Sequence, residues 1–569
     1  MPDTPGIGAA PLLSAVTGLR GALDGATLPL DIPGSGTARQ TRTRLIDQLD
    51  DYVLPRLRSI DAPLLAVVGG STGAGKSTLV NSLVGREVTQ PGVLRPTTRS
   101  PVLVHHPDDA AWFTDQRILP GLARVTGSAP SASSTGTVQL VATGTIGRGL
   151  ALLDAPDIDS VVAANRDLAA QLLAAADLWL FVTTAARYAD AVPWDLLREA
   201  GERGTAVAIV LDRVPPEVVD DIRQHLAEML REQGLDAARI FPITESPLTQ
   251  GLLPDEQSAP LRIWLTELAG DAQARAAVVR QTLEGALESL GQRVAALAAA
   301  SAEQDAAAAE LVDAARSAYH DALDQVRDGM VDGTLLRSEV LARWQEFVGT
   351  GEFFRQIESG VSRLRDRLSA FFTGEPPRTE ALGDALQTGA AALIANHAEL
   401  AATAIARAWR SLPGGQQLLA VSPALAAPSA GLDARVERLV RDWQGDIFDM
   451  VREEGRDRRT TARLMAYGVN GLGVALMLLA FASTAGLALI EVGIAGGTAV
   501  ASQKVLEAVF GDQAVRELAT KARERLVERV EDVYVSELRR FEDAVGAAGL
   551  EPGQSAALAA AARTVRDLR

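Results

Sequence analysis

A glycine-rich stretch that runs into lysine and serine is the part of the sequence best suited to chemistry. Residues 62–80 read APLLAVVGGSTGAGKSTLV, an apolar run, a turn and the start of an apolar-periodic helix. Gly70, Gly75, Lys76 and Ser77 fill the pattern G-x-x-x-x-G-K-[ST] between a predicted strand and a predicted helix. Backbone N–H groups of such a turn and the N-terminus of the helix attract phosphate oxygens. The stretch therefore predicts a phosphate-binding loop; the alternative is a glycine turn that merely links a strand to a helix.

Two side chains of this loop have specific expected roles. We expect Lys76 to reach the β- and γ-phosphates of a nucleotide and the Ser77 hydroxyl to bind Mg²⁺. Lysine occurs only at positions 76, 504 and 521, so Lys76 does not reflect a lysine-rich composition. The predicted nucleotide-binding residues of the loop are Gly70, Ser71, Thr72, Gly73, Ala74, Gly75, Lys76, Ser77 and Thr78.

Hydrolysis of a nucleotide also needs an acid near the metal and a hydroxyl near the γ-phosphate. Asp154 follows the apolar run at residues 150–153, and its carboxylate is predicted to hold Mg²⁺ through water. The segment 92–101, GVLRPTTRSP, offers Thr97 and Thr98 just before a predicted strand. A threonine pair in a loop is also common in an ordinary polar turn. Its position between two phosphate-site motifs favours the nucleotide interpretation.

Composition limits the function classes that the chain can serve. Its 569 residues favour two or three domains, and a formal net charge of −17 argues against nucleic acid as a main partner. The absence of cysteine excludes disulfides, thiolate metal sites and cysteine nucleophiles. The five histidines show no metal-ligand spacing. The N-terminus has no basic start followed by an apolar run, so we expect no secretory signal and a cytoplasmic location.

Strand and helix patterns alternate through residues 62–268, which predicts an α/β domain with a mainly parallel sheet and helices on both faces. The predicted strands are 101–105, 138–143, 149–153, 178–183, 206–211 and 240–244, in addition to the strand before the phosphate loop. Ahead of this domain we expect a loosely ordered segment at 1–37. An amphipathic helix at 38–61 is expected to pack with the helical half of the chain.

Beyond residue 268 the strand signal disappears, and the pattern predicts an all-α stalk or bundle. Its first part is expected at 269–463 and its return part at 504–569. Between them, Leu464 to Ile490 contains no charged residue, and after Glu491 an uncharged run extends to Gln503. The length exceeds the roughly 20 residues that a helix needs to cross a bilayer core. We therefore predict a hydrophobic membrane-contact hairpin at 464–503; the alternative is a hairpin buried at the centre of the bundle.

The motif order GGSTGAGKST, TRSPVLV and LLDAPD resembles the GTPase domain of dynamin-like proteins, particularly the bacterial ones. The resemblance in motifs covers roughly residues 62–246, and beyond them it rests on the helical architecture. It implies that Lys76 and Ser77 bind phosphate and Mg²⁺, that Thr98 is the threonine of the first switch and that Asp154 is the acid of the second. It also implies GTP as substrate, a membrane lipid partner and self-assembly as a homodimer or oligomer, with a paired dynamin-like protein as one form. The expected place is the inner face of the cell membrane.

The sequence departs from the family pattern at three places. Asp157 stands where the family has glycine, and Asp212-Arg213-Val214-Pro215 stands where it has the guanine-reading [NT]-K-x-D. Thr72 stands where dynamins place a water-orienting glutamine, which leaves Lys76, Thr72 and Thr98 as the predicted catalytic residues. Asp212 is expected near the base, with Arg213 stacking where the family's lysine does. Residues 244–246 are the candidates for a loop that closes over the base.

Two alternatives remain open on the sequence. The bound nucleotide could be ATP instead of GTP, since Pro215 replaces the aspartate that reads guanine. The chain could also be a nucleotide-dependent switch or scaffold whose apolar hairpin is core, without membrane remodelling.

Overall fold

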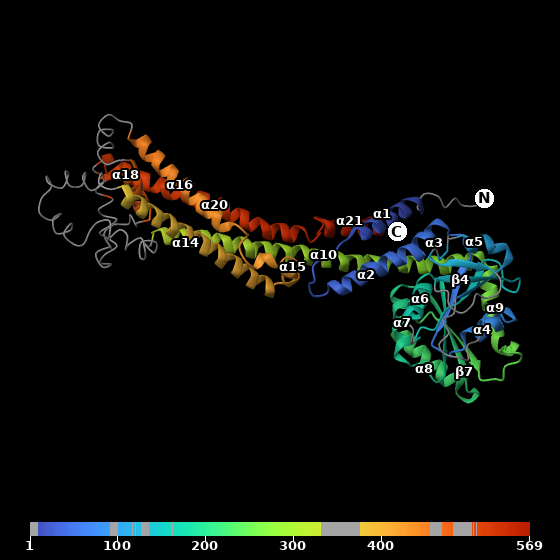
Figure 1. Cartoon of the computed structure of the whole chain (residues 1–569). Coiled ribbons are helices and arrows are strands. Elements are labelled where there is room, and N and C mark those ends of the chain that lie inside the picture. The colour runs from blue at the N-terminus through green and yellow to red at the C-terminus, as the bar shows by residue number, and fades with distance from the viewer. Residues whose placement is uncertain are drawn as a thin grey trace, which may run out of the picture. The chain divides into compact units, whose positions relative to one another are not determined.

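The computed structural model describes residues 9–90, 101–115, 118–119, 121–126, 136–160, 163–331, 376–455, 469–481, 503, 506–507 and 509–569 (Figure 1). The chain divides into two compact units. The first comprises Met1–Leu28, Gly34–Ala302 and Glu551–Arg569, and the second comprises Pro29–Pro33 and Glu303–Leu550.

One eight-stranded sheet forms the centre of the first unit. Its strands are β1 (Leu64–Gly70), β2 (Val102–His105), β3 (Ala123–Thr126), β4 (Thr137–Ala142), β5 (Leu150–Asp154), β6 (Leu178–Thr184), β7 (Ala206–Val214) and β8 (Arg239–Thr244). The spatial order is β3-β4-β2-β5-β1-β6-β7-β8, and only the β2–β5 pair is antiparallel. The predicted mainly parallel sheet is confirmed. Strand β3 was not predicted, because its four residues are exposed or half-buried and carry no apolar run.

Helices cover both faces of the sheet, as the alternation of strand and helix patterns predicts. In β1, Leu64, Ala66 and Val68 face one apolar core, and Leu65 and Val67 face the other. The first core is completed by α4 (Lys76–Val84) and α9 (Asp255–Gly270). The second is completed by α5 (Ala110–Thr114), α6 (Ala163–Ala174), α7 (Ala191–Glu202) and α8 (Val219–Glu232). The short 3₁₀ turns η2 (Pro107–Asp109) and η3 (Pro216–Val218) precede α5 and α8.

A group of helices packs together in the same unit. It comprises α1 (Ala9–Gly25), α2 (Ser35–Gln48), the π-helical turn η1 (Leu49–Val53), α3 (Leu54–Arg58), the first half of α10 (Ala272–Val331) and α21 (Gln554–Asp567). A buried ion pair between Arg56 of α3 and Asp177, just before β6, joins this group to the sheet. Asp177 also accepts the Leu65 backbone N–H, at 2.8 Å. The predicted domain boundaries stay predictions.

Helices are the only regular secondary structure in the described part of the second unit, which confirms the predicted long helical region after the sheet. It contains the second half of α10, α14 (Pro376–Ser411), α15 (Gly415–Val421), the turn η5 (Pro423–Ala426), α16 (Leu432–Glu454), α18 (Val469–Ala480) and α20 (Asp512–Gly546). Figure 1 shows α14, α16 and α20 running along one another. Their shared core contains Trp409, Trp443, Phe481 and Phe541.

Helix α18 is the described part of the segment predicted to contact a membrane. Every residue from Gly471 to Ala480 is buried, and the helix packs against α14, α16 and α20. The contact is so close at Gly473 that a Cβ there would lie 2.2 Å from the Phe448 ring. Residues 464–468 and 482–502 of the predicted hairpin lie outside the described residues. Among the helices that the structure describes, none has both the length and the apolar character needed to cross a bilayer.

Candidate functional site

The sheet topology gathers the predicted site at one edge. Strands β5, β1, β6 and β7 are neighbours and parallel, so their carboxyl ends lie together. In the register, Asp154 at the end of β5 pairs with Val68 of β1, and Asp212 of β7 pairs with Thr184 at the end of β6. Ligands of open α/β sheets bind outside this edge. The phosphate-loop candidate, between β1 and α4, lies there too.

Glycine is required at two positions of the loop because other backbones and side chains approach closely. A Cβ on Gly70 would lie 2.0 Å from the Val182 carbonyl oxygen. Gly75 has φ +93°, and a Cβ there would lie 2.6 Å from Oδ2 of Asp212. Between them, the Ser71 hydroxyl is buried and makes no hydrogen bond among the described residues. The loop thus has a backbone that is closely packed at Gly70 and Gly75, and it contains a buried hydroxyl, that of Ser71, without a hydrogen-bond partner among the described residues.

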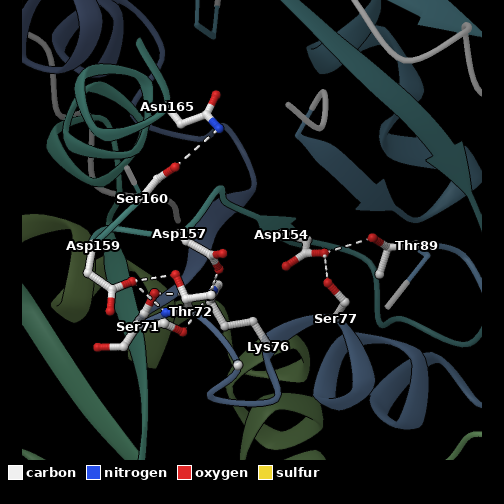
Figure 2. Close-up of polar contacts among 12 residues, drawn as sticks. Ser71, Thr72, Lys76, Ser77, Thr89, Asp154, Asp157, Asp159, Ser160 and Asn165 are labelled. Carbon is white, nitrogen blue, oxygen red and sulfur yellow. Dashed lines mark hydrogen bonds and ion pairs between the residues drawn. The ribbon is translucent and has the colours of Figure 1, made fainter. Parts of the chain in front are cut away.

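The ammonium group of Lys76 points back into this loop (Figure 2). The side chain is 6% exposed. Its Nζ donates to the carbonyl oxygens of Gly70 at 2.9 Å and Ser71 at 3.0 Å, and to Oδ1 of Asp157 at 2.5 Å. The predicted phosphate-binding lysine therefore lies in the loop. It is paired with Asp157, the residue that stands where the family has glycine.

The two described residues predicted to serve Mg²⁺ lie in direct contact. The Ser77 hydroxyl donates to Oδ2 of Asp154 at 2.8 Å, and the Thr89 hydroxyl donates to the same oxygen at 2.7 Å (Figure 2). The side-chain amide of Asn81 fixes the backbone of Thr89. Its Nδ2 donates to the Thr89 carbonyl, and its Oδ1 accepts from the Thr89 N–H. Hydroxyl and carboxylate oxygens are the ligands that Mg²⁺ prefers, so this donor set fits the ion. Thr97 and Thr98 lie outside the described residues.

Thr72, the residue at the position of the family's glutamine, is held by an acid and an arginine. Its backbone N–H and hydroxyl donate to Oδ1 of Asp159, at 2.5 and 2.6 Å. Arg187 donates to the Thr72 carbonyl at 3.1 Å and to Oδ2 of Asp159 at 3.0 Å, and it also pairs with Asp190. Burial alone would raise the pKa of Asp159, but the hydrogen bonds from Thr72 and Arg187 outweigh it and lower that pKa.

The segment in place of the guanine-reading motif turns two side chains toward the loop. The pairing of β7 with β8 is irregular between Leu211 and Val214, and Arg213 has φ +52°, which is uncommon outside glycine. The Arg213 guanidinium donates to the Gly73 carbonyl. Burial raises the pKa of Asp212, and Arg213 only partly opposes the effect. The structure therefore brings Asp212 and Arg213 beside the predicted phosphate loop.

The remaining predicted residues lie in or next to these elements. Ala74 is buried and its N–H donates to the Ser71 carbonyl, while the carbonyl of Thr78, in α4, accepts from Ser82. At the end of β8, the Glu245 N–H donates to the Val214 carbonyl. The neighbouring Ser246 hydroxyl is buried without a hydrogen bond in the described part of the chain.

Four residues of the site were not predicted: Asn81, Thr89, Asp159 and Arg187. None belongs to a spacing pattern. Thr89, Asp159 and Arg187 reach the site through contacts between segments 65, 87 and 115 positions apart, whereas Asn81 enters it through Thr89, eight positions away. Asp159 is the exception with a weak signal, since it stands two residues after Asp157 in the predicted second-switch segment.

The sequence matches no protein-family model, and a search of curated proteins found no match. Comparison of the fold with solved structures does find similar chains. The chain resembles bacterial dynamins. Two chains described as an oligomerised bacterial dynamin pair, which senses and tethers membranes over long range, align with TM-scores of 0.44 and 0.40 at 9% and 10% identity. The alignments cover 100% and 93% of this chain and 96% and 95% of those chains.

A third similar structure is LeoA, a bacterial dynamin GTPase from ETEC. It aligns with a TM-score of 0.23 at 12% identity, over 94% of this chain and 97% of LeoA. At these scores and identities, none of the similarities assigns a role to a residue of this chain.

Proposed function

We propose that this chain is a dynamin-like GTPase that binds and hydrolyses GTP with Mg²⁺ and couples its nucleotide state to self-assembly and to membrane binding or remodelling. The observation that carries the proposal is the meeting of Lys76, Ser77 and Asp154 at the carboxyl edge of a parallel sheet. Ser77 and Asp154 are 77 positions apart in sequence, yet their side chains share a hydrogen bond. That arrangement is what a phosphate and Mg²⁺ site of a P-loop protein needs.

Different groups of the loop would bind different parts of a Mg²⁺-triphosphate. Backbone N–H groups of the loop and the start of α4 would bind phosphate oxygens, and Lys76 would neutralise part of their charge. Ser77 and Asp154 would hold Mg²⁺, which when bound stabilises negative charge that develops on the transferred phosphoryl group. Thr72 stands where it could orient water, and its hydrogen bonds to Asp159 fix its backbone and hydroxyl.

Guanine binding is supported by the side chains beside the loop. The Asp212 side chain is 14% exposed and approaches Gly75, and Asp212 lies near the end of β7, where it pairs with Thr184 of β6. Such a carboxylate can accept hydrogen bonds from the N–H groups of guanine, whereas adenine offers one exocyclic amine. Pro215, at the position of the family's aspartate, supplies no acceptor side chain, so the choice between guanine and adenine rests on Asp212.

Nucleotide choice is tested by competition. A fluorescent, non-hydrolysable guanine triphosphate analogue is bound to the full chain with Mg²⁺, and excess GTP or ATP is added. We expect GTP to displace the probe and ATP to do so only at much higher concentration. Displacement by ATP alone would overturn the guanine assignment. Lys76→Ala is the control, because it should bind neither nucleotide.

A second candidate function is favoured by the burial of α18. Ten consecutive residues of the uncharged stretch, Gly471 to Ala480, lie in the helical core. This supports a nucleotide-dependent switch or scaffold whose apolar segment stabilises the bundle. Membrane contact would then have to come from the residues of the stretch that lie outside α18.

Flotation with liposomes separates the two candidates. The test uses the full chain with GTP and a variant that carries Leu487→Glu and Leu489→Glu, two positions of the uncharged stretch outside the described residues. The membrane proposal expects the wild-type protein to float with anionic liposomes and the double variant to remain at the bottom. A wild-type protein that never floats would favour the scaffold.

A further inference from the structure

The phosphate-loop candidate already carries an anion that belongs to the chain itself. Asp157 follows β5, in the segment that begins with Asp154, and its Oδ1 lies 2.5 Å from Nζ of Lys76. Figure 2 shows this carboxylate above the loop, beside the lysine and Asp159. The Asp157 side chain is 37% exposed, whereas Lys76 is 6% exposed, so the pair is desolvated mainly on the lysine side.

The hydrogen-bonding capacity of Lys76 is fully used in this arrangement. An ammonium group has three N–H donors and no acceptor. Here the acceptors are the carbonyl oxygens of Gly70 and Ser71 and the carboxylate of Asp157. The two carbonyls belong to the loop that would surround the phosphates. A phosphate oxygen can therefore bond Lys76 only if it displaces one of the three acceptors, and Asp157 is the one that does not belong to the loop.

A second acid of the same segment contacts the loop in the same manner. Asp159 accepts the Thr72 backbone N–H, one of the donors that such a loop offers to phosphate. It is also held by Arg187, which donates to the Thr72 carbonyl. Three hydrogen bonds, two from Thr72 and one from Arg187, thus fix the Asp159 side chain, whereas the Asp157 side chain bonds only Lys76 among the described residues.

From these contacts we propose that Asp157 sets the nucleotide affinity of the site by competing with phosphate for Lys76. The inference rests on the proposed function. The backbone on both sides of Asp157 is bonded to β1, through Ala155 N–H to Val68 O and Ile158 N–H to Gly70 O. Rotation of the half-exposed Asp157 side chain away from Lys76 therefore frees the ammonium group without breaking these backbone bonds.

Competition and structural support predict opposite changes in nucleotide affinity when Asp157 is removed. If Asp157 merely supports the loop, its removal weakens nucleotide binding. If it competes with phosphate, its removal strengthens binding, because phosphate then no longer has to displace the Asp157 carboxylate from Lys76. We expect Asp157→Asn and Asp157→Ala to lower the Kd for a triphosphate by about tenfold, which corresponds to about 1.4 kcal/mol.

The experiment measures the Kd of a non-hydrolysable guanine triphosphate analogue, of the matching adenine analogue and of inorganic triphosphate, each with Mg²⁺. It uses the full chain as wild type, Asp157→Asn, Asp157→Ala and the control Asp195→Asn. Asp195 pairs with Arg198 on the surface of α7, so the control removes the same charge away from the loop. Circular dichroism melting of each variant shows that it is folded.

The expected result is tighter binding by both Asp157 variants for every probe, inorganic triphosphate included, and an unchanged Kd for Asp195→Asn. Equal or weaker binding by the Asp157 variants, with measurable binding by the wild type, would overturn the competition and leave the proposed function intact. An equal gain in affinity in Asp195→Asn would show that the change in net charge alone strengthens binding. That result would also overturn the competition. No binding by any variant would overturn both.

Discussion

The hydroxyl of Thr89 and the carboxylate of Asp154 lie 2.7 Å apart across 65 positions of sequence. Asp154 is the acid predicted to hold Mg²⁺, and the same oxygen accepts from Ser77. Thr89 therefore acts as a positioning residue, because it fixes the direction in which the carboxylate points. Its own backbone is fixed by Asn81, so the chain of contacts leads back into α4.

Replacement of Thr89 by valine should weaken the response to Mg²⁺. Valine keeps the shape and removes the hydrogen bond to a charged group, an interaction worth about 1.5–3 kcal/mol. We expect the Mg²⁺ concentration for half-maximal nucleotide binding to rise by about tenfold, which is 1.4 kcal/mol. Thr89→Ser should restore the wild-type value. The measurement is a Mg²⁺ titration of nucleotide binding, and identical curves for valine, serine and threonine would refute the role.

Replacement of Arg56 by methionine should destabilise the sheet near β1 and β6. Arg56 pairs with Asp177, and the two side chains are 6% and 1% exposed. Burial lowers the pKa of Arg56, but the contact with Asp177 outweighs it and raises that pKa. Removal of one partner of a buried pair leaves an uncompensated charge and costs about 3–5 kcal/mol.

Hydrogen exchange at the Leu65 amide reports on this loss directly, because that N–H donates to Asp177. A loss of about 3 kcal/mol speeds exchange by more than about 100-fold where exchange follows local opening. Arg198→Met is the matched control, since Arg198 is half exposed in its pair with Asp195. A change as small in Arg56→Met as in the control would contradict the prediction.

Replacement of Asp212 by asparagine should stabilise the ligand-free protein and weaken guanine binding. Burial raises the pKa of Asp212 in the folded state, so its ionised form opposes folding. The cost is fully present above the folded pKa and vanishes as pH falls below the unfolded value of about 3.9. Thermal melting at pH 7 should therefore favour Asp212→Asn, and the difference should shrink toward pH 4. A variant less stable than wild type at pH 7 would contradict this reading.

Glu537 in the second unit should behave in the opposite way. It is buried and accepts hydrogen bonds from Ser429 and Arg540, with Arg435 as a further ion-pair partner. Burial raises its pKa, but these bonds outweigh it and lower the pKa. Its contribution to stability is thus present above the unfolded value of about 4.3 and is lost as pH falls through the folded pKa.

Glu537→Gln should accordingly unfold at lower urea concentration than wild type at pH 7, by about 3 kcal/mol. The gap between the two proteins should begin to shrink below about pH 4.3 and should close only after the pH has fallen through the lowered pKa of folded Glu537. Urea unfolding at several pH values measures both effects. A gap that stays constant with pH would show that the charge of Glu537 does not matter.

The fold was largely predictable because its main elements carry their signal locally. Strands β1 and β6 are continuous apolar runs that are buried along their whole length, and they were found. Strand β3 was missed because Arg124 and its neighbours are half-buried or exposed at the edge of the sheet. The burial of α18 could not be separated from membrane contact, since an apolar helix has the same composition in either place.

The site was predictable as far as its motif extends. The glycine turn, Lys76 and Ser77 form a spacing pattern that chemistry requires, and the acid at the end of β5 follows from parallel topology. The contacts of Asp157 with Lys76 and of Asp159 with Thr72 depend on tertiary geometry between segments that are 81 and 87 positions apart. Residue types alone do not specify such contacts.

Isothermal titration calorimetry of a non-hydrolysable guanine triphosphate into the full chain tests the nucleotide site most directly. With Mg²⁺ present, we expect one binding site per wild-type chain. Binding should fall below detection in Lys76→Ala and should weaken when Mg²⁺ is removed. No heat of binding in the wild type, or the same affinity in wild type and Lys76→Ala, would contradict a phosphate site built on Lys76.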